Sequence, residues 1–302
     1  FLGTKVITYE LEELVPYIDW NPFFQTWNIH GKYPNRHYPK VFNDPDVGKQ
    51  AKELFDEAQA LMQEIIKDKL FQARGIVGFY PANTSVDDIE LYSDEGRTTV
   101  VGTMYGLRQQ NHRPDSGDHR FTCLSDFVAP KGSGIADYIG MFAVSAGFGV
   151  EELAKKFEAK NDDYNSIMAK ALADRFAEAA AEKLHHDVRT KLWGYSPEES
   201  LSETDLLKVK YQGIRPAAGY PSQPDHTEKS TMWQVMDIFA QTQIELTDSL
   251  MMFPAASVSG LYFANPKSHY FGVGKITKEQ VEDYARRKNM DIATVERWLR
   301  NL

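Results

Sequence analysis

The sequence contains one cysteine, Cys123, among its 302 residues. An intrachain disulfide framework and a cysteine-rich structural zinc site are therefore excluded, and a reducing, cytoplasmic setting is expected. Long hydrophobic runs are missing as well, since no stretch approaches the roughly 20 apolar residues that span a bilayer. The first residues, Phe1 to Thr4, do not form a charged segment followed by an apolar one. We therefore expect a soluble protein with no membrane partner.

Positive charge is also scarce. The 34 Lys and Arg residues are outnumbered by 43 Asp and Glu residues, which gives a formal net charge of −9. Proteins that bind nucleic acid gather Lys and Arg, so no nucleic-acid partner is expected. Hydrophobic residues make up 42% of the chain, enough for a sizeable core. The chain does not begin with Met, and we interpret it as a fragment of a longer protein.

Hydrophobic periodicity predicts several elements in the first two thirds of the chain. Apolar residues recur at three- and four-residue steps from Asp46 to Leu70, which predicts a helix. A second helical pattern runs from Glu151 to Leu192, and the polar stretch Asn161 to Asp163 is expected to split it. Runs rich in β-branched and aromatic residues predict strands. These are Ile76–Tyr80, which Pro81 is expected to end, and Asp88–Tyr92, Thr98–Tyr105 and Tyr138–Ser145.

In the last third, two segments match the capping-box pattern that begins a helix, one from Ser196 to Glu199 and one from Thr277 to Gln280. A further helix is predicted from Glu228 to Ala240, and strands are predicted at Val258–Ala264 and Tyr270–Ile276. No repeat or flexible linker interrupts the order, so residues 1–302 are expected to form one domain. Mixed groups of strands and helices favour an α+β fold, a large twisted, mostly antiparallel sheet flanked by helices.

Common catalytic and metal-binding motifs are missing. The segment from Phe271 to Thr277 resembles a phosphate loop. That motif requires a Gly five residues before its second Gly and a Ser or Thr directly after its Lys, but these places hold His269 and Ile276. Gly147 and Gly149 lack the third Gly of a dinucleotide fingerprint. His185 and His186 are adjacent, do not form a metal motif, and are expected to be solvated residues on a helix face. No Gly-x-Ser-x-Gly elbow indicates a hydrolase. We expect no metal in this chain and no catalytic side chain.

The segment from Tyr211 to Pro221 combines two prolines and two glycines around Arg215 and Tyr220. Proline restricts the backbone, and glycine lets a ligand approach the main chain closely. Arg215 can bind a carboxylate or phosphate through two hydrogen bonds, and Tyr220 can cover a ring. From the residues alone, a small-ligand site and an ordinary structured surface loop are equally plausible.

This segment and the residues that follow it, up to Lys229, resemble the activation domain of cobalamin-dependent methionine synthases. The resemblance extends over nearly the whole chain, in the same order. It is carried by Tyr17–Phe24, Gly31–Pro34, Leu107–Gln110, Asp126–Pro130, Ala136–Gly140, Ser257–Gly260 and Val281–Lys288.

The resemblance implies that the chain binds S-adenosylmethionine. It implies that the domain presents the methyl group for reductive remethylation of cob(II)alamin, which is held mainly by a neighbouring cobalamin-binding domain of the same enzyme. After one-electron reduction the cobalt is the nucleophile, so proximity and orientation would be this domain's contribution. The electron would come from a flavodoxin-like protein or a diflavin methionine synthase reductase. The whole enzyme transfers methyl from 5-methyltetrahydrofolate to homocysteine, and the isolated domain is not expected to make methionine.

The matching positions imply a ligand site. Arg215 would pair with the carboxylate of S-adenosylmethionine, and Asp19 would accept the ammonium group. The remaining implied positions are Tyr220 and the loop backbone at Ala217 and Gly219 for the adenosine, Tyr270 and Phe271 as pocket lining, and Glu178 as an acid near the site.

Each of these positions has an ordinary structural alternative. Asp19 can be a helix cap or a turn residue. Tyr270 and Phe271 can be core or sheet-face residues. Asp174, one helical turn before Glu178, can lie on a solvated acidic face. We interpret Asp174 and Glu178 as facing the cobalamin-binding domain.

Two other functions remain open. A freestanding module that senses S-adenosylmethionine would need no cobalamin partner. A stand-alone methyltransferase would need an acceptor pocket or a base, and the glycine-rich nucleotide loop common in that class is absent.

Overall fold

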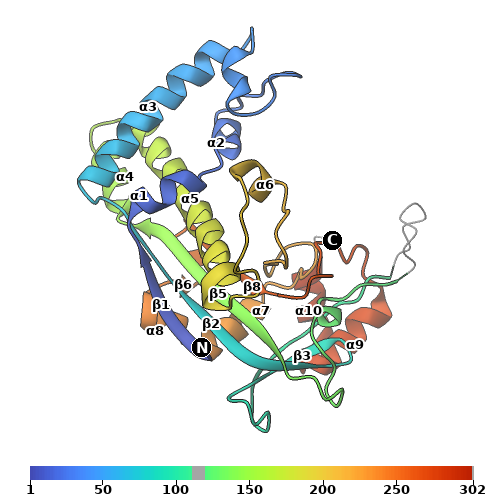
Figure 1. Cartoon of the computed structure of the whole chain (residues 1–302). Coiled ribbons are helices and arrows are strands. Elements are labelled where there is room, and N and C mark those ends of the chain that lie inside the picture. Colours follow the sequence, from blue (N-terminus) through green and yellow to red (C-terminus); the bar gives the residue numbers. More distant parts are fainter. Residues whose placement is uncertain (111–119, 301–302) are drawn as a thin grey trace.

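The computed structural model describes residues 1–110 and 120–300, which form a six-stranded antiparallel sheet flanked by helices (Figure 1). The order is β4-β3-β2-β5-β8, and β1 also pairs with β2. All five pairings between these strands are antiparallel. The strands are β1 (Gly3–Tyr9), β2 (Gln72–Ser85), β3 (Asp88–Tyr92), β4 (Val100–Met104), β5 (Asp137–Phe148) and β8 (Ser257–Tyr262). The predicted α+β class is confirmed.

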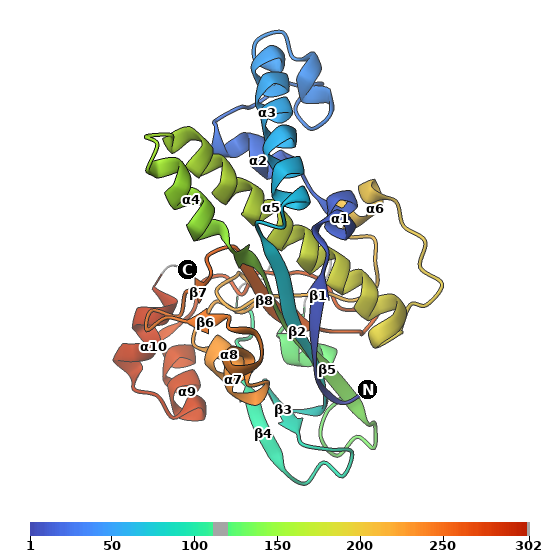
Figure 2. The ribbon, with the colours of Figure 1, turned by 90° about the vertical axis from the view of Figure 1, so that its left-hand side faces the viewer.

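Each face of the sheet packs against its own helices because side chains alternate along a strand. Phe142 and Val144 of β5 point toward α5 (Asp163–Asp187), whereas Met141 and Ala143 belong to the core on the other face. That second core includes Met232 of α7 (Glu228–Val235) and Ile238 of α8 (Ile238–Thr242). In Figures 1 and 2, α5 and the α7–α8 pair lie on opposite sides of the sheet.

Two groups of helices lie at the ends of the molecule. At one end, α3 (Gly48–Lys67) extends away from the sheet beside α2 (Asn21–Thr26) (Figure 2). At the other, α9 (Lys278–Lys288) and α10 (Ile292–Leu299) enclose a small core of their own. The remaining described elements are α1 (Leu11–Leu14), α4 (Val150–Glu158), α6 (Glu203–Leu207), the two-stranded pair β6 (Glu245–Leu246) and β7 (Met252–Phe253), and short 3-10 or π turns at Val15–Tyr17, Lys40–Asn43, Leu124–Phe127 and Val188–Leu192.

The helices predicted from periodicity are confirmed, with one refinement. The predicted split of the pattern from Glu151 to Leu192 is also confirmed, because the Asp162 side chain accepts a hydrogen bond from the Asn165 backbone and begins α5. The helix predicted from Glu228 to Ala240 breaks at Asp237, which has a left-handed backbone with φ of 49°. No helix among the described residues is both long and apolar enough to cross a membrane.

The prediction that Pro81 ends a strand is wrong, since β2 continues to Ser85. Pro81 pairs with Tyr138 of β5 on one side. On the other side, β1 stops pairing at Phe79 and β3 starts pairing at Ala82. Proline has no N–H to donate, and it is tolerated here because neither of these strands pairs with it on that side.

The helix start predicted at Ser196 is also wrong. The Glu199 carboxylate, which should cap the helix, binds the buried Arg189 guanidinium through two hydrogen bonds of 2.6 and 2.9 Å. The chain therefore forms a turn, and the next helix, α6, begins after Ser202 with a capping box of its own. At Thr277 the predicted start is confirmed, because its side chain accepts a hydrogen bond from the Gln280 backbone.

The strand predicted at Tyr270–Ile276 is absent; the segment is irregular. Its backbone groups bind loops instead of a neighbouring strand. The Val273 N–H donates to the Pro221 carbonyl at 2.8 Å, and the Gly272 carbonyl accepts from the Gln109 side chain at 2.8 Å. The first bond holds the segment against the loop from Tyr211 to Pro221.

Candidate functional site

A cleft of about 890 Å³ lies where α5, β8 and the loop from Tyr211 to Pro221 meet. This volume is within the range of small-molecule sites. Its wall is mixed, with apolar side chains beside a few charged ones. It is lined by Phe142, Glu178, Arg215–Ala218, Tyr220–Ser222, His226, Lys229, Met251, Met252, Ala255, Ser257–Ser259 and Tyr270–Gly272.

The first half of the loop is attached to the sheet. Ile214 and Phe263 exchange backbone hydrogen bonds of 3.1 Å just beyond the end of β8, and the Leu261 N–H donates to the Pro216 carbonyl at 2.9 Å. Gly260 allows this close approach, because a Cβ at that position would lie 2.8 Å from the Pro216 carbonyl oxygen. The loop is therefore fixed beside β8, on the same edge of the sheet as the cleft.

The second half of the loop is a tight turn. Gly219 has a positive φ of 88°, and a Cβ there would lie 2.1 Å from the His226 ring. Its N–H donates to the Gln223 carbonyl at 2.7 Å, which closes the turn. Among the described residues, the N–H groups of Ala217 and Ala218 have no hydrogen-bond partner. The turn can therefore offer two backbone donors to a ligand in the cleft.

Arg215 is held by residues of α5. Its Nη2 donates to the Glu182 carboxylate at 2.6 Å, and its Nη1 donates to His185 Nδ1 at 2.8 Å and to the Tyr211 hydroxyl at 3.2 Å. Burial works against the charged guanidinium, but the Glu182 carboxylate together with the Tyr211 and Tyr270 side chains outweighs it, so the pKa of Arg215 is raised. The Arg215 side chain is 18% exposed, so part of a permanently charged group remains accessible from the cleft.

A second cavity of about 430 Å³ adjoins the cleft, and Glu178 and Arg215 line both. Asp19 lines this second cavity and not the cleft. Its Oδ1 accepts hydrogen bonds from the Asn21 N–H and side-chain amide at 3.0 and 2.9 Å, as a turn residue would. Its Oδ2 has no hydrogen-bond partner among the described residues. Asp19 thus has both a turn role and a carboxylate oxygen left over.

The aromatic residues at the cleft differ in exposure. Tyr220 is 63% exposed and Tyr270 is 45% exposed, so both can cover a ligand. The Tyr270 hydroxyl also accepts a hydrogen bond of 2.9 Å from the Arg215 N–H, which ties the two loops together. Phe271 is partly buried, with its ring 6.2 Å from that of Phe127.

The family model for the activation domain of vitamin B12 dependent methionine synthase matches residues 10–289. The chain belongs to this family.

The fold of this activation domain is similar to a solved structure, the MetH reactivation domain bound to AdoHcy. The two chains are 50% identical and superpose with a TM-score of 0.93. The match covers 99% of this chain and 89% of the other. The resemblance of the sequence to the activation domain is therefore confirmed.

Two residues that hold Arg215 do not follow from the motifs of the activation domain. Glu182, which lines the second cavity, and His185, which lines neither cavity, lie four and seven residues after Glu178. This spacing places all three on one face of α5. That spacing is the signal that could have found them. Lys229 also lines the cleft, although its Nζ donates to the Leu250 carbonyl at 2.6 Å. The expectation that His185 is solvated is wrong, because the side chain is 0% exposed.

Asp174 is exposed on α5 one turn before Glu178 and lines neither cavity. Among the described residues, no group of three or more His, Cys, Asp or Glu side chains could hold a metal ion.

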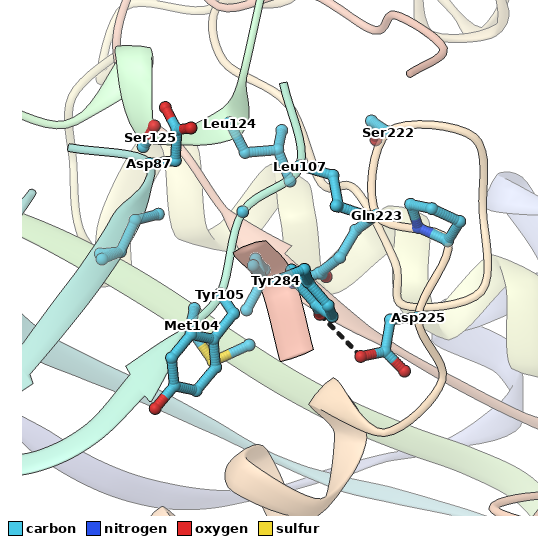
Figure 3. Close-up of a pocket in the computed structure, with 14 residues that line it drawn as sticks. Asp87, Met104, Tyr105, Leu107, Leu124, Ser125, Ser222, Gln223, Asp225 and Tyr284 are labelled. Carbon is cyan, nitrogen blue, oxygen red and sulfur yellow. Dashed lines mark hydrogen bonds between the residues drawn. The ribbon is translucent and has the colours of Figure 1, made fainter. Parts of the chain in front are cut away.

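A small cavity lies behind the loop that follows Pro221 (Figure 3). Its volume of about 10 Å³ is close to the minimum that one water molecule needs, and it is too small for an organic ligand. Beside it, the Tyr284 hydroxyl donates to Asp225 at 2.6 Å, and Lys288 binds both Asp225 and Glu228. This buried cluster joins α9 to the chain segment that leads out of the cleft.

Proposed function

We propose that this domain binds S-adenosylmethionine in the cleft and adjoining cavity, and presents its methyl group to a cobalamin on a neighbouring domain of the same enzyme. The observation that carries the proposal is the position of Arg215 and Glu178, which border both cavities. A ligand with an adenosine at one end and an amino acid at the other can extend past them. Family membership and the AdoHcy-bound relative support this interpretation.

Each part of the ligand finds a chemically suitable partner. The accessible edge of the Arg215 guanidinium suits the carboxylate, and the Asp19 and Glu178 carboxylates suit the ammonium. Tyr220, Tyr270 and Phe271 offer aromatic surface for the adenosine, and Ala217, Ala218 and Gly219 offer backbone groups. Around the amino-acid end, the four acids that line the second cavity outnumber its two arginines, which suits a ligand whose sulfonium and ammonium give it a net positive charge. The acids are Asp19, Glu178, Glu182 and Glu203, and the arginines are Arg175 and Arg215.

The chain's contribution to methyl transfer would be to bind and aim the donor. A cobalamin held by the neighbouring domain would supply the metal nucleophile, and the electron would come from a flavodoxin-like protein or a diflavin reductase. The residues of this chain would bind both ends of the ligand and so fix the position of the sulfonium. Proximity and orientation would then speed the methyl transfer. Such a domain would serve reactivation during methionine biosynthesis in the cytoplasm and would not itself make methionine.

Calorimetric titration with S-adenosylmethionine tests the ligand assignment. We expect the parent chain to bind and Arg215→Ala to bind at least tenfold more weakly, since an ion pair is lost. Absence of binding by a well-folded parent would refute the assignment. Equal affinity of both proteins would leave the ligand in place and remove Arg215 from its site.

We further propose that Asp174 faces the cobalamin-binding domain during reactivation, because it is exposed beside the cleft on the same helix face as Glu178. In the intact enzyme, Asp174→Lys should slow reductive methylation while the titrated affinity for S-adenosylmethionine stays unchanged. The matched control is Asp163→Lys at the start of α5, which should leave both readouts unchanged. Reductive methylation at the normal rate by Asp174→Lys would exclude Asp174 from the interface.

A further inference from the structure

The Arg215 guanidinium is oriented by two side chains of α5: Glu182, which lines the second cavity, and His185, which lines neither cavity. Glu182 and His185 bind its two terminal nitrogens at 2.6 and 2.8 Å. The Nε–H group has no hydrogen-bond partner among the described residues. Arginine is always charged, and a free arginine side chain loses rotamer entropy when it is held in one geometry. Here that ordering is achieved before any ligand arrives.

His185 can only accept in this arrangement. Arginine has no acceptor, so Nδ1 carries the lone pair and the ring proton is on Nε2. Burial, with the charges of Arg215 and Arg189 added, lowers the pKa of His185 well below 6.5, so the ring stays neutral. A neutral acceptor orients the guanidinium without cancelling its charge.

The His185 ring cannot turn freely. It stacks on Tyr262 with centroids 5.1 Å apart and meets the edge of Tyr211 at 4.7 Å. Tyr211 is in turn covered by the Arg189 guanidinium, 4.2 Å from its ring centroid. Arg189 is itself fixed by Glu199. The orientation of Arg215 is therefore built into the interior of the protein.

We propose that Glu182 and His185 are positioning residues that hold Arg215 ready for the carboxylate of the methyl donor. This inference rests on the proposed function, since it takes S-adenosylmethionine as the ligand. Its consequence is selectivity. The domain should prefer S-adenosylmethionine over decarboxylated S-adenosylmethionine, which differs only in lacking the carboxylate, and that preference should depend on Glu182 and His185.

The experiment titrates the 302-residue chain and its variants with these two ligands, and the ratio of the two affinities is the readout. His185→Phe keeps a ring but removes the acceptor, and Glu182→Leu removes the carboxylate. Each should lower the preference about tenfold, mainly by weakening binding of S-adenosylmethionine. His185→Asn and Glu182→Gln keep an acceptor oxygen and should retain most of the preference. Circular dichroism and thermal unfolding establish which variants are folded.

The outcomes separate the inference from the function. A well-folded parent that binds neither ligand would refute the proposed function. A parent that binds both equally would refute only the carboxylate contact. If His185→Phe and Glu182→Leu bind both ligands as the parent does, or lose both equally, the positioning role is wrong. A higher preference in Glu182→Leu would also overturn it, because Glu182 would then compete with the ligand. If one of these two variants does not fold, the affinity ratio of the other tests the positioning role.

Discussion

At the scale of single residues, the cleft depends on positions where only glycine fits. Gly219 combines a left-handed backbone with contact against the His226 ring, and its N–H closes the turn that follows Arg215. Because Gly219 has no side chain, the chain can close this turn, and the closed turn makes the loop rigid. We therefore expect the polar side chains around the loop to move little when a ligand binds.

Gly219→Ala should therefore destabilise the protein by about 1–3 kcal/mol, from the positive φ and the contact with His226. It should also weaken binding of S-adenosylmethionine, because the turn must shift. Urea unfolding and calorimetry measure the two effects. The matched control is Gly272→Ala in the same cleft, where a Cβ meets only Pro221 at 3.5 Å. Unchanged stability of Gly219→Ala would show that the loop tolerates a rearrangement.

At the scale of elements, α9 is held in place by a buried ion cluster. The Lys288 side chain at its end is 9% exposed and binds the carboxylates of Asp225 and Glu228, which are 3% and 0% exposed. Burying two acids is costly unless a cation compensates them. The helix is thus coupled to the segment that carries Pro221 and His226 into the cleft.

Replacing Lys288 by Met should destabilise the protein by about 3–5 kcal/mol, because two buried carboxylates lose their cation. Lys278→Met, on the same helix, is the control. Its side chain is 81% exposed and 4.0 Å from Glu282, so its loss should change stability by no more than about 0.5 kcal/mol. Chemical denaturation measures the free energy of unfolding of both variants and of the parent. Similar small effects of both variants would mean that the cluster does not support the fold.

At the scale of the whole molecule, the buried acid makes stability depend on pH. Burial raises the pKa of Glu228 from its ordinary value of 4.5 to about 7, against the opposing charge of Lys288. A raised pKa means that the folded state binds the proton more tightly than the unfolded state. The stabilising contribution is complete below about pH 4.5 and is lost as the pH rises through 7.

Glu228→Gln removes this dependence. The difference in unfolding free energy, variant minus parent, should increase from about pH 5 to about pH 7 by at most about 1.4 kcal/mol per pH unit, and then level off. The lowered pKa of His185 makes stability fall toward acid pH in both proteins, so its effect cancels in the difference. Denaturant titrations at unit steps from about pH 5 to about pH 8 measure it. A difference that is flat across this range would contradict the raised pKa.

Sequence reasoning succeeded where the pattern was local. The periodicity of α3 and of the α4–α5 pair, the run of β-branched and aromatic residues in β5 and the Thr277 cap all depend on neighbours within a few residues. It failed at Pro81, Ser196 and Tyr270. In each case a distant partner decided the local structure. The strands on one side of Pro81 leave it unpaired, and Arg189 binds the Glu199 carboxylate that was expected to cap a helix at Ser196. Loops bind the segment that begins at Tyr270.

The sequence by itself determined the fold class, the family and the loop that carries Arg215, because strand and helix periods and a motif of consecutive residues are written along the chain. Only the tertiary structure decided what surrounds Arg215. Glu182 and His185 reach it because α5 packs across the sheet beside the loop. Long-range contacts of this kind depend on packing and desolvation, which no local pattern records.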